Sequence, residues 1–214
     1  MAPHPCSGCG KIDGLLCSNC KYDIISESFD GCVACGRPAI RNGLCKECHV
    51  PYSRAWCVGE RADALLRLID GYKFERAKAA HRPLAELLAA RLPDLPTNTI
   101  VVPIPTVNSH IRQRGYDHTF LVTRHLTKAK KLQMLQPLER ITSTKQRGAS
   151  RQQRIKQAKQ AFGLRSEVQP DRPYLLIDDV VTTGVTLKYA AKILKDAGAM
   201  DVWVAVVARH PSTK

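Results

Sequence analysis

The sequence has few acidic residues, few aromatic residues and no long apolar run, and each shortage excludes a class of protein. No stretch approaches the roughly 20 apolar residues that a membrane-spanning helix needs, so we expect no membrane span. The start, MAPHPCSGCG, has neither a basic beginning nor an apolar core segment, which argues against a signal peptide and leads us to expect a cytoplasmic protein. Aromatic residues make up only 6%, so any binding of nucleic acid should depend on phosphates rather than on base stacking.

The shortage of acids leaves a large positive charge. There are 19 acidic and 33 basic residues among 214, a net charge of +14, and this balance favours polyanionic partners such as nucleic acid or phosphorylated small molecules. The excess is concentrated in residues 124–165, which hold twelve Lys or Arg and a single acid, Glu139. Such a stretch is either a solvated face or mobile loop, or a surface that attracts phosphates.

Cysteine is absent after residue 57, and most of the nine cysteines up to that residue are arranged for metal binding. Eight of them form four C-x-x-C pairs, and in a reducing cytosol a disulfide framework is not expected. Four such pairs in so short a segment are typical of zinc sites. The predicted metal ligands are Cys6, Cys9, Cys17, Cys20, Cys32, Cys35, Cys45 and Cys48.

The cysteine segment repeats internally. CSGCGKIDGLLCSNC and CVACGRPAIRNGLCKEC share C-x-x-C-G, a short loop and L-C-x-x-C, which predicts two successive zinc ribbons, each binding one structural Zn²⁺ through its own four thiolates. A crossed arrangement, in which each ion takes one pair from each repeat, is the alternative. Cys57, beside Trp56, is interpreted as a buried apolar filler, with a reactive thiol as the alternative. His49 is a further alternative ligand.

The remaining sequence predicts an α/β fold with a mainly parallel sheet, because its strands are apolar on both faces and alternate with helices. We expect residues 1–57 to form the zinc module, residues 49–60 to connect it onward, and residues 58–214 to form the second domain. QAFGL (160–164) is expected to return to the sheet. The predicted helices cover residues 61–74, 83–92, 118–132 and 186–198, and the predicted strands cover 99–105, 174–177 and 201–208.

The most informative stretch is IDDVVTTGVT (177–186). Asp178 and Asp179 follow an apolar strand, and residues 182–186 form a loop before a helix, where backbone amides, hydroxyls and the helix dipole can hold a phosphate. The acids would repel phosphate, but they can accept hydrogen bonds from ribose hydroxyls or bind Mg²⁺. The stretch therefore predicts a site for a ribose 5-phosphate. The alternative is that Asp179 caps a helix and that the threonines are turn residues.

YLLIDDVVTTGVT resembles the motif with which type I phosphoribosyltransferases bind 5-phosphoribosyl 1-pyrophosphate (PRPP). Together with VVPIP…RQRGYDH, KF at 73–74, TKQRGASRQQR and AFGL, it makes the chain similar to the ComF (ComFC) proteins, which also carry a cysteine-rich zinc module. The resemblance implies a type I phosphoribosyltransferase fold behind a double zinc ribbon and Mg²⁺ bound with PRPP. It also implies a role in DNA uptake, with single-stranded DNA and proteins of the uptake machinery as partners.

The resemblance also assigns residues. Arg112 and Arg114 would contact the pyrophosphate and, with Asp178 and Asp179, form the catalytic set. Residues 140–162 would be the mobile catalytic hood, with Gln146 and Arg154 as matching positions. Asp117 and Gln157 stand where the family usually has Asn, and Asp117 would be an acid near the pyrophosphate. The implied PRPP-binding residues are Asp178, Asp179, Val181, Thr182, Thr183, Gly184, Val185, Thr186 and Lys73.

Three functions follow as hypotheses. The first is a phosphoribosyltransferase that displaces pyrophosphate at ribose C1 in favour of an acceptor that the sequence does not identify. The second is a DNA-uptake factor that handles single-stranded DNA through residues 124–165. The third is a regulator that binds PRPP without catalysis.

Overall fold

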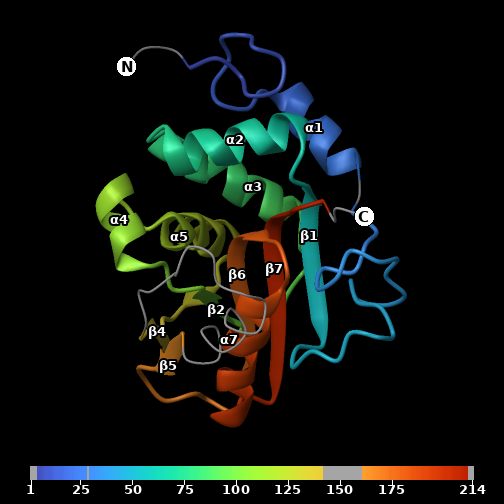
Figure 1. Ribbon diagram of the computed structural model, residues 1–214, viewed down its shortest axis with the longest axis vertical. Coiled ribbons are helices and arrows are strands. Elements are labelled where there is room, and N and C mark those ends of the chain that lie inside the picture. Colours follow the sequence, from blue (N-terminus) through green and yellow to red (C-terminus); the bar gives the residue numbers. More distant parts are fainter. Residues whose placement is uncertain (1–3, 28, 142–160, 212–214) are drawn as a thin grey trace, which may run out of the picture.

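A five-stranded sheet, parallel throughout, organises the computed structural model, which describes residues 4–27, 29–141 and 161–211 (Figure 1). The strand order is β1-β7-β6-β2-β3, so β6 lies at the centre with β7 and β2 beside it. This confirms the predicted α/β fold with a mainly parallel sheet. The strands of the sheet are β1 (Arg54–Glu60), β2 (Ile100–Pro103), β3 (Gln133–Met134), β6 (Pro173–Val181) and β7 (Asp201–Arg209).

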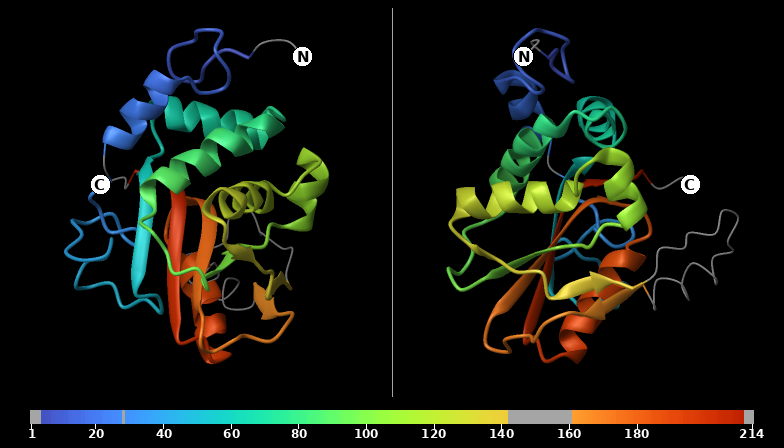
Figure 2. Two further views of the ribbon diagram at one scale, coloured as in Figure 1. Left: turned by 180° about the vertical axis from the view of Figure 1, so that it is seen from behind. Right: turned by 90° about the vertical axis from the view of Figure 1, so that its left-hand side faces the viewer.

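Helices cover both faces of the sheet, which explains why its strands carry almost continuous apolar runs (Figure 2). One face packs against α2 (Asp63–Phe74), α3 (His81–Arg91) and α5 (His118–Lys130), and the other packs against α7 (Val185–Asp196). In β7, for example, Trp203 lies in the first core and Val204 in the second. Because side chains alternate along a strand, one strand contributes residues to the cores on both faces of the sheet.

The predicted helices and the βαβ unit at the end of the chain are confirmed. α2, α3, α5 and α7 lie within or close to the predicted ranges, and β6, α7 and β7 form a parallel crossover. The remaining elements are α1 (Ser18–Ser26), the 3-10 helix η1 (Lys78–Ala80), α4 (Asn108–Arg114), β4 (Leu138–Arg140) and β5 (Phe162–Leu164). In the part of the chain that the structure describes, every helix is too short or too polar to cross a membrane.

Two expectations about connections were wrong. Residues 54–60 are not a connection but form β1, which pairs with β7 along its length. The apolar run in this strand is short, and its partner lies at the other end of the sequence, so the local pattern gave little signal. The predicted division at residue 57/58 falls inside β1 and stays a prediction. The segment containing QAFGL does not join the main sheet, because β5 pairs antiparallel with β4 in a separate two-stranded sheet.

β6 continues past the predicted strand at 174–177. It remains paired with β7 as far as Val181. Asp178 and Asp179 therefore lie within the strand, near its C-terminal end, and not in the loop after it. Residues 142–160, which include Gln146, Arg154 and Gln157 and most of the expected hood, lie outside the described residues.

The edge of the sheet at β1 is covered by the cysteine-rich segment. Ala55 N donates to Asn42 O at 2.8 Å, so the chain around residue 42 takes up part of the open edge. Arg91 of α3 reaches the same edge, donating to Cys57 O and Phe29 O at 3.0 Å each. Unpaired strand edges invite association with other chains, so this cover gives the segment a structural role besides metal binding.

Candidate functional site

The eight predicted cysteine ligands gather into two groups of four, each from one repeat. The groups are Cys6, Cys9, Cys17 and Cys20 (the first cluster) and Cys32, Cys35, Cys45 and Cys48 (the second cluster). Within each cluster all four sulfurs lie within 4.8 Å of one another. The structure therefore supports the grouping by repeat and not the crossed arrangement, and His49 belongs to neither cluster.

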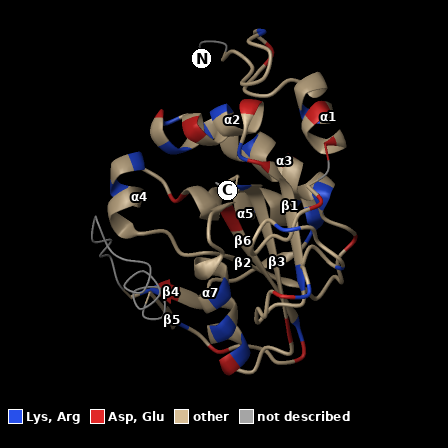
Figure 3. Cartoon of the chain, turned by 45° about the vertical axis from the view of Figure 1, so that its right-hand side comes forward, with Lys and Arg blue, Asp and Glu red and all other residues tan. Residues whose placement is uncertain are grey.

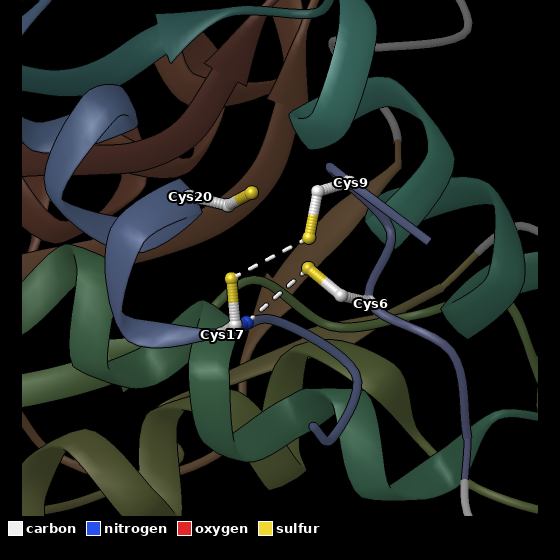
Figure 4. Close-up of side chains that lie close together, drawn as sticks. All are labelled: Cys6, Cys9, Cys17 and Cys20. Carbon is white, nitrogen blue, oxygen red and sulfur yellow. Dashed lines mark hydrogen bonds between the residues drawn. The ribbon is translucent and has the colours of Figure 1, made fainter. Parts of the chain in front are cut away.

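The spacing of the sulfurs fits a tetrahedral zinc site. The Sγ atoms of Cys9 and Cys17 are 3.8 Å apart (Figure 4), and those of Cys35 and Cys45 are 3.6 Å apart. Four sulfurs at about 2.3 Å from a central Zn²⁺ would be separated by about 3.8 Å. Each cluster could thus hold one Zn²⁺ with a complete set of four ligands, as a structural site requires.

The two repeats differ in the backbone that carries their cysteines. In the first cluster Cys17 precedes α1 and Cys20 lies in its first turn. In the second repeat short bridges join Gly31 to Pro38 and Arg41 to Leu44, a ribbon-like arrangement.

Cys57 is structurally distinct from these ligands. It is buried in β1 with its thiol donating to Gly59 O at 3.2 Å, and burial raises its pKa to about 12. A thiol held in its protonated form is a poor nucleophile, which favours the interpretation as a buried filler.

The two adjacent acids of β6 have different surroundings. Asp179 is buried, and its Oδ2 lies 2.9 Å from Nζ of Lys73, on α2, and 2.7 Å from Nε2 of His118, on α5. Burial alone would raise the pKa of Asp179, but the neighbouring His118 and Lys73 outweigh it and lower that pKa below its usual range. Asp179 is therefore an anion held inside the protein by two partners.

His118 is held in one tautomer. Arg114 NH1 lies 2.8 Å from His118 Nδ1, and a guanidinium has no acceptor, so Nδ1 must accept this hydrogen bond. In the neutral imidazole the proton then sits on Nε2, the atom that lies 2.7 Å from Asp179 Oδ2. Arg114 thus acts on Asp179 through His118, from the end of α4.

Asp178 is the more open carboxyl of the pair. It is partly buried, and its Oδ1 accepts from Asp179 N at 2.9 Å. Burial, together with the negative charge of Asp179, raises its pKa to about 7. On the other side of the site, the charge of Asp178 is felt by Arg140 of β4, whose guanidinium lies over the Phe162 ring. Asp178 is thus the carboxyl better placed to meet a ligand.

The loop of residues 182–186 leads directly into α7. Gly184 is the N-cap with φ 68°, a left-handed conformation that favours glycine. Among the described residues no side chain caps this helix, so its first amides remain available to an anion. Thr182 and Thr183 are exposed, while Val181 is buried at the end of β6 and Val185 and Thr186 begin α7.

The predicted pyrophosphate residues divide into one engaged and one exposed arginine. Both lie in the last turn of α4, but Arg114 contacts His118 whereas the side chain of Arg112 is exposed. Figure 3 shows basic residues on α4 and on α7. Asp117 has a structural role, because its Oδ1 accepts from Phe120 N as the N-cap of α5 and from Thr106 Oγ1. The structure thus gives that acid a partner other than pyrophosphate, Mg²⁺ or an Arg.

His118 was not predicted to be a site residue, although the sequence carries a signal for it. His118 lies on the buried stripe of α5, in helical register with Val122 and Leu126. A histidine on the apolar face of a helix, directly after a basic segment, needs a buried partner. That partner, Asp179, is distant in sequence, so only the fold identifies it.

Comparisons with known proteins agree with this arrangement. Residues 127–214 match the model of the phosphoribosyl transferase domain family, which covers β6, α7 and β7 with the loop between them. Competence protein F of Haemophilus influenzae is 30% identical over 91% of this chain and 90% of its own. Competence protein ComFC of Bacillus subtilis is 26% identical over 88% and 81%, and the DNA utilization protein YhgH of Escherichia coli is 30% identical over 80% and 82%.

Proposed function

This chain belongs to the ComF family of competence proteins, and on that premise we propose that it binds PRPP and acts in the uptake or use of DNA. The observation that carries the proposal is the uncapped start of α7, directly beside Asp178 at the end of β6. The amides of residues 182–186 would bind the 5′-phosphate, and Asp178 would accept hydrogen bonds from the ribose hydroxyls.

Asp179 has a different part in the proposal. Because Lys73 and His118 already hold its Oδ2, its main role is to fix these two side chains at the site. Lys73 and Arg112 would then present positive charge to the pyrophosphate, with Arg114 positioning His118. We also propose that each of the two cysteine clusters binds one structural Zn²⁺.

Mg²⁺ would enter with PRPP. The ion commonly binds through one or two carboxylates together with substrate phosphates, and the more open carboxyl of Asp178 fits that pattern. When bound, it would balance the charge of the leaving pyrophosphate. In a transfer reaction the bond from ribose C1 to pyrophosphate breaks as a bond to the acceptor forms, and the protein contributes positioning and positive charge.

The test is calorimetric titration of the purified protein with PRPP in the presence of Mg²⁺. We expect saturable binding by the wild type and at least about a tenfold loss for Asp178→Asn, because the amide replaces a charged acceptor. Asp196→Asn, at an exposed site on α7, is the matched control. Binding that survives Asp178→Asn unchanged would contradict the proposal. Pyrophosphate release with a screen of acceptors separates a transferase from a PRPP-binding regulator.

A specific observation favours an additional function in DNA binding. Arg124 and Lys128 lie one turn apart on the exposed side of α5, and Lys131 follows directly, so part of the basic region 124–165 forms a positive surface. The names of the relatives, competence and DNA utilization, fit this role. Affinity for single-stranded DNA should fall steeply with salt concentration. An affinity indifferent to salt would contradict phosphate-driven binding.

A further inference from the structure

The second cysteine cluster touches the proposed phosphate loop. A Cβ added to Gly184 would lie 3.2 Å from Ala34 O and 3.4 Å from Ala34 Cα, so the two backbones are in close contact there. Ala34 stands between Cys32 and Cys35, two ligands of the second cluster. The turn that presents these sulfurs, residues 32–35, therefore supports the loop at its left-handed glycine.

Arg209 connects the same turn, residues 32–35, to the sheet through a hydrogen bond. Its NH1 donates to Val33 O at 2.6 Å, and both residues are buried, with Arg209 5% exposed. Arg209 ends β7 opposite Val181, the last residue of β6 before the loop. His210 N also donates to Val181 O at 2.8 Å. The turn is thus attached both to the loop and to the strand end beside it.

The buried charge of Arg209 needs compensation, since an isolated cation is costly in the interior. Arg209 donates to the carbonyl of Val33, the residue directly after Cys32, so its guanidinium lies beside the turn that carries two ligands of the second cluster. Four thiolates around one Zn²⁺ carry a net negative charge. The loaded second cluster would accordingly stabilise Arg209, and Arg209 would hold the turn against the loop.

The first cluster has a different environment. Its backbone is held by Arg67 of α2, which donates to Ser7 O at 2.5 Å and to Gly8 O at 3.2 Å. Lys21 of α1 pairs with Glu86 of α3. In Figure 1, α1 and the chain before it lie beyond α2 and α3, on the outer side of the helical layer.

We propose that metal at the second cluster positions residues 182–186 for sugar-phosphate binding, and that metal at the first cluster does not. The proposal rests on the proposed function, since it concerns the same phosphate loop. It makes Arg209 a positioning residue that acts through residues 32–35 on the loop. Loss of metal from the second cluster would therefore weaken ligand binding without any change in the residues that touch the ligand.

The experiment compares Cys35→Ser with Cys9→Ser in the full chain, one ligand removed from each cluster. Zinc content, calorimetric titration with ribose 5-phosphate and hydrogen exchange of the amides of residues 182–187 are measured for each variant and for wild type. We expect both variants to lose zinc. Cys35→Ser should bind ribose 5-phosphate at least about tenfold more weakly and exchange these amides faster, whereas Cys9→Ser should stay within about threefold of wild type.

Arg209→Met is a second test, needed because Cys35→Ser could weaken binding simply by unfolding the protein. It keeps all eight cysteines, so zinc content should be unchanged, yet affinity for ribose 5-phosphate should fall about tenfold because the tie to Val33 O is lost. Unchanged affinity in Arg209→Met would overturn the proposal, as would equal losses in Cys35→Ser and Cys9→Ser. If wild type itself fails to bind ribose 5-phosphate, the proposed function fails, and hydrogen exchange alone decides whether the second cluster orders the loop.

Discussion

The two sides of β6 at its C-terminal end carry neighbouring carboxyls with opposite properties. On the side of α2 and α5, Asp179 is buried and held as an anion by Lys73 and His118, which lower its pKa. On the other side, Asp178 is more open, and burial with the charge of its neighbour raises its pKa to about 7. Successive side chains in a strand point to opposite faces, so one dipeptide can serve two environments.

This difference indicates that Asp178 and Asp179 have different roles. Asp179 is part of the folded scaffold, because its two partners come from two helices, α2 and α5, and join the helical layer to the sheet. Asp178 destabilises the fold when it ionises, which is typical of a group retained for a ligand rather than for stability. Substitutions on each side should therefore change the free energy of unfolding in opposite directions.

Lys73→Met should give the largest effect on stability. The substitution leaves Asp179 buried with His118 as its remaining partner, and we expect a loss of about 3 kcal/mol in the free energy of unfolding at neutral pH. Urea titration measures this change. The lowered pKa of Asp179 contributes stability above about pH 4, the pKa range of an unfolded Asp, and that contribution is lost as the pH falls further. The deficit of the variant should shrink in acid accordingly.

Lys78→Met is the control for this measurement. Lys78 is exposed in η1, so its substitution should change the free energy of unfolding by no more than about 0.5 kcal/mol. Equal effects of the two substitutions would show that the Lys73–Asp179 pair does not support the fold.

Asp178→Asn should stabilise the protein, and only at high pH. Because the folded pKa is raised to about 7, the native state binds this proton more tightly than the unfolded chain does. Wild-type stability therefore falls as the pH rises from about 4 to about 7, and the amide removes this fall. We expect the variant to be about 1 kcal/mol more stable at pH 8, allowing for partial exposure, and nearly equal at pH 4.5. A variant less stable than wild type at pH 8 would contradict the contrast between the two acids.

Arg114→Met should change the free energy of unfolding by a similar amount and should also have a clear spectroscopic effect. It removes the donor to His118 Nδ1 and should cost about 1 kcal/mol. With that hydrogen bond gone, the Nε2–H tautomer loses its constraint, and the ¹⁵N shifts of the ring should report a mixture. An unchanged ring spectrum would mean that Asp179 alone fixes the tautomer.

Much of the fold could be predicted from the sequence, because its strongest signals are local. The strand before the acids, the helix after them and the last strand each carry a continuous pattern, and the internal repeat fixes which cysteines group together. β1 was missed because it pairs with β7, which lies about 150 residues further along the chain. The contact of Gly184 with Ala34 and the contact of Asp179 with His118 were not predicted either, because each joins residues that are distant in sequence. They arise from tertiary packing, which the local pattern does not encode.

Arg112→Gln should give the smallest change in stability and sharpen the comparison at the ligand. The side chain is exposed at the end of α4, so we expect a change of at most about 0.5 kcal/mol in the free energy of unfolding. If Arg112 meets the pyrophosphate, affinity for PRPP should fall about fivefold or more while affinity for ribose 5-phosphate stays the same. Arg82→Gln removes an exposed charge from α3 and should change neither affinity. If Arg112→Gln weakened the binding of both ligands equally, Arg112 would contribute only general positive charge and would not contact the pyrophosphate. Lys73, which pairs with Asp179, would then be the remaining candidate for that contact.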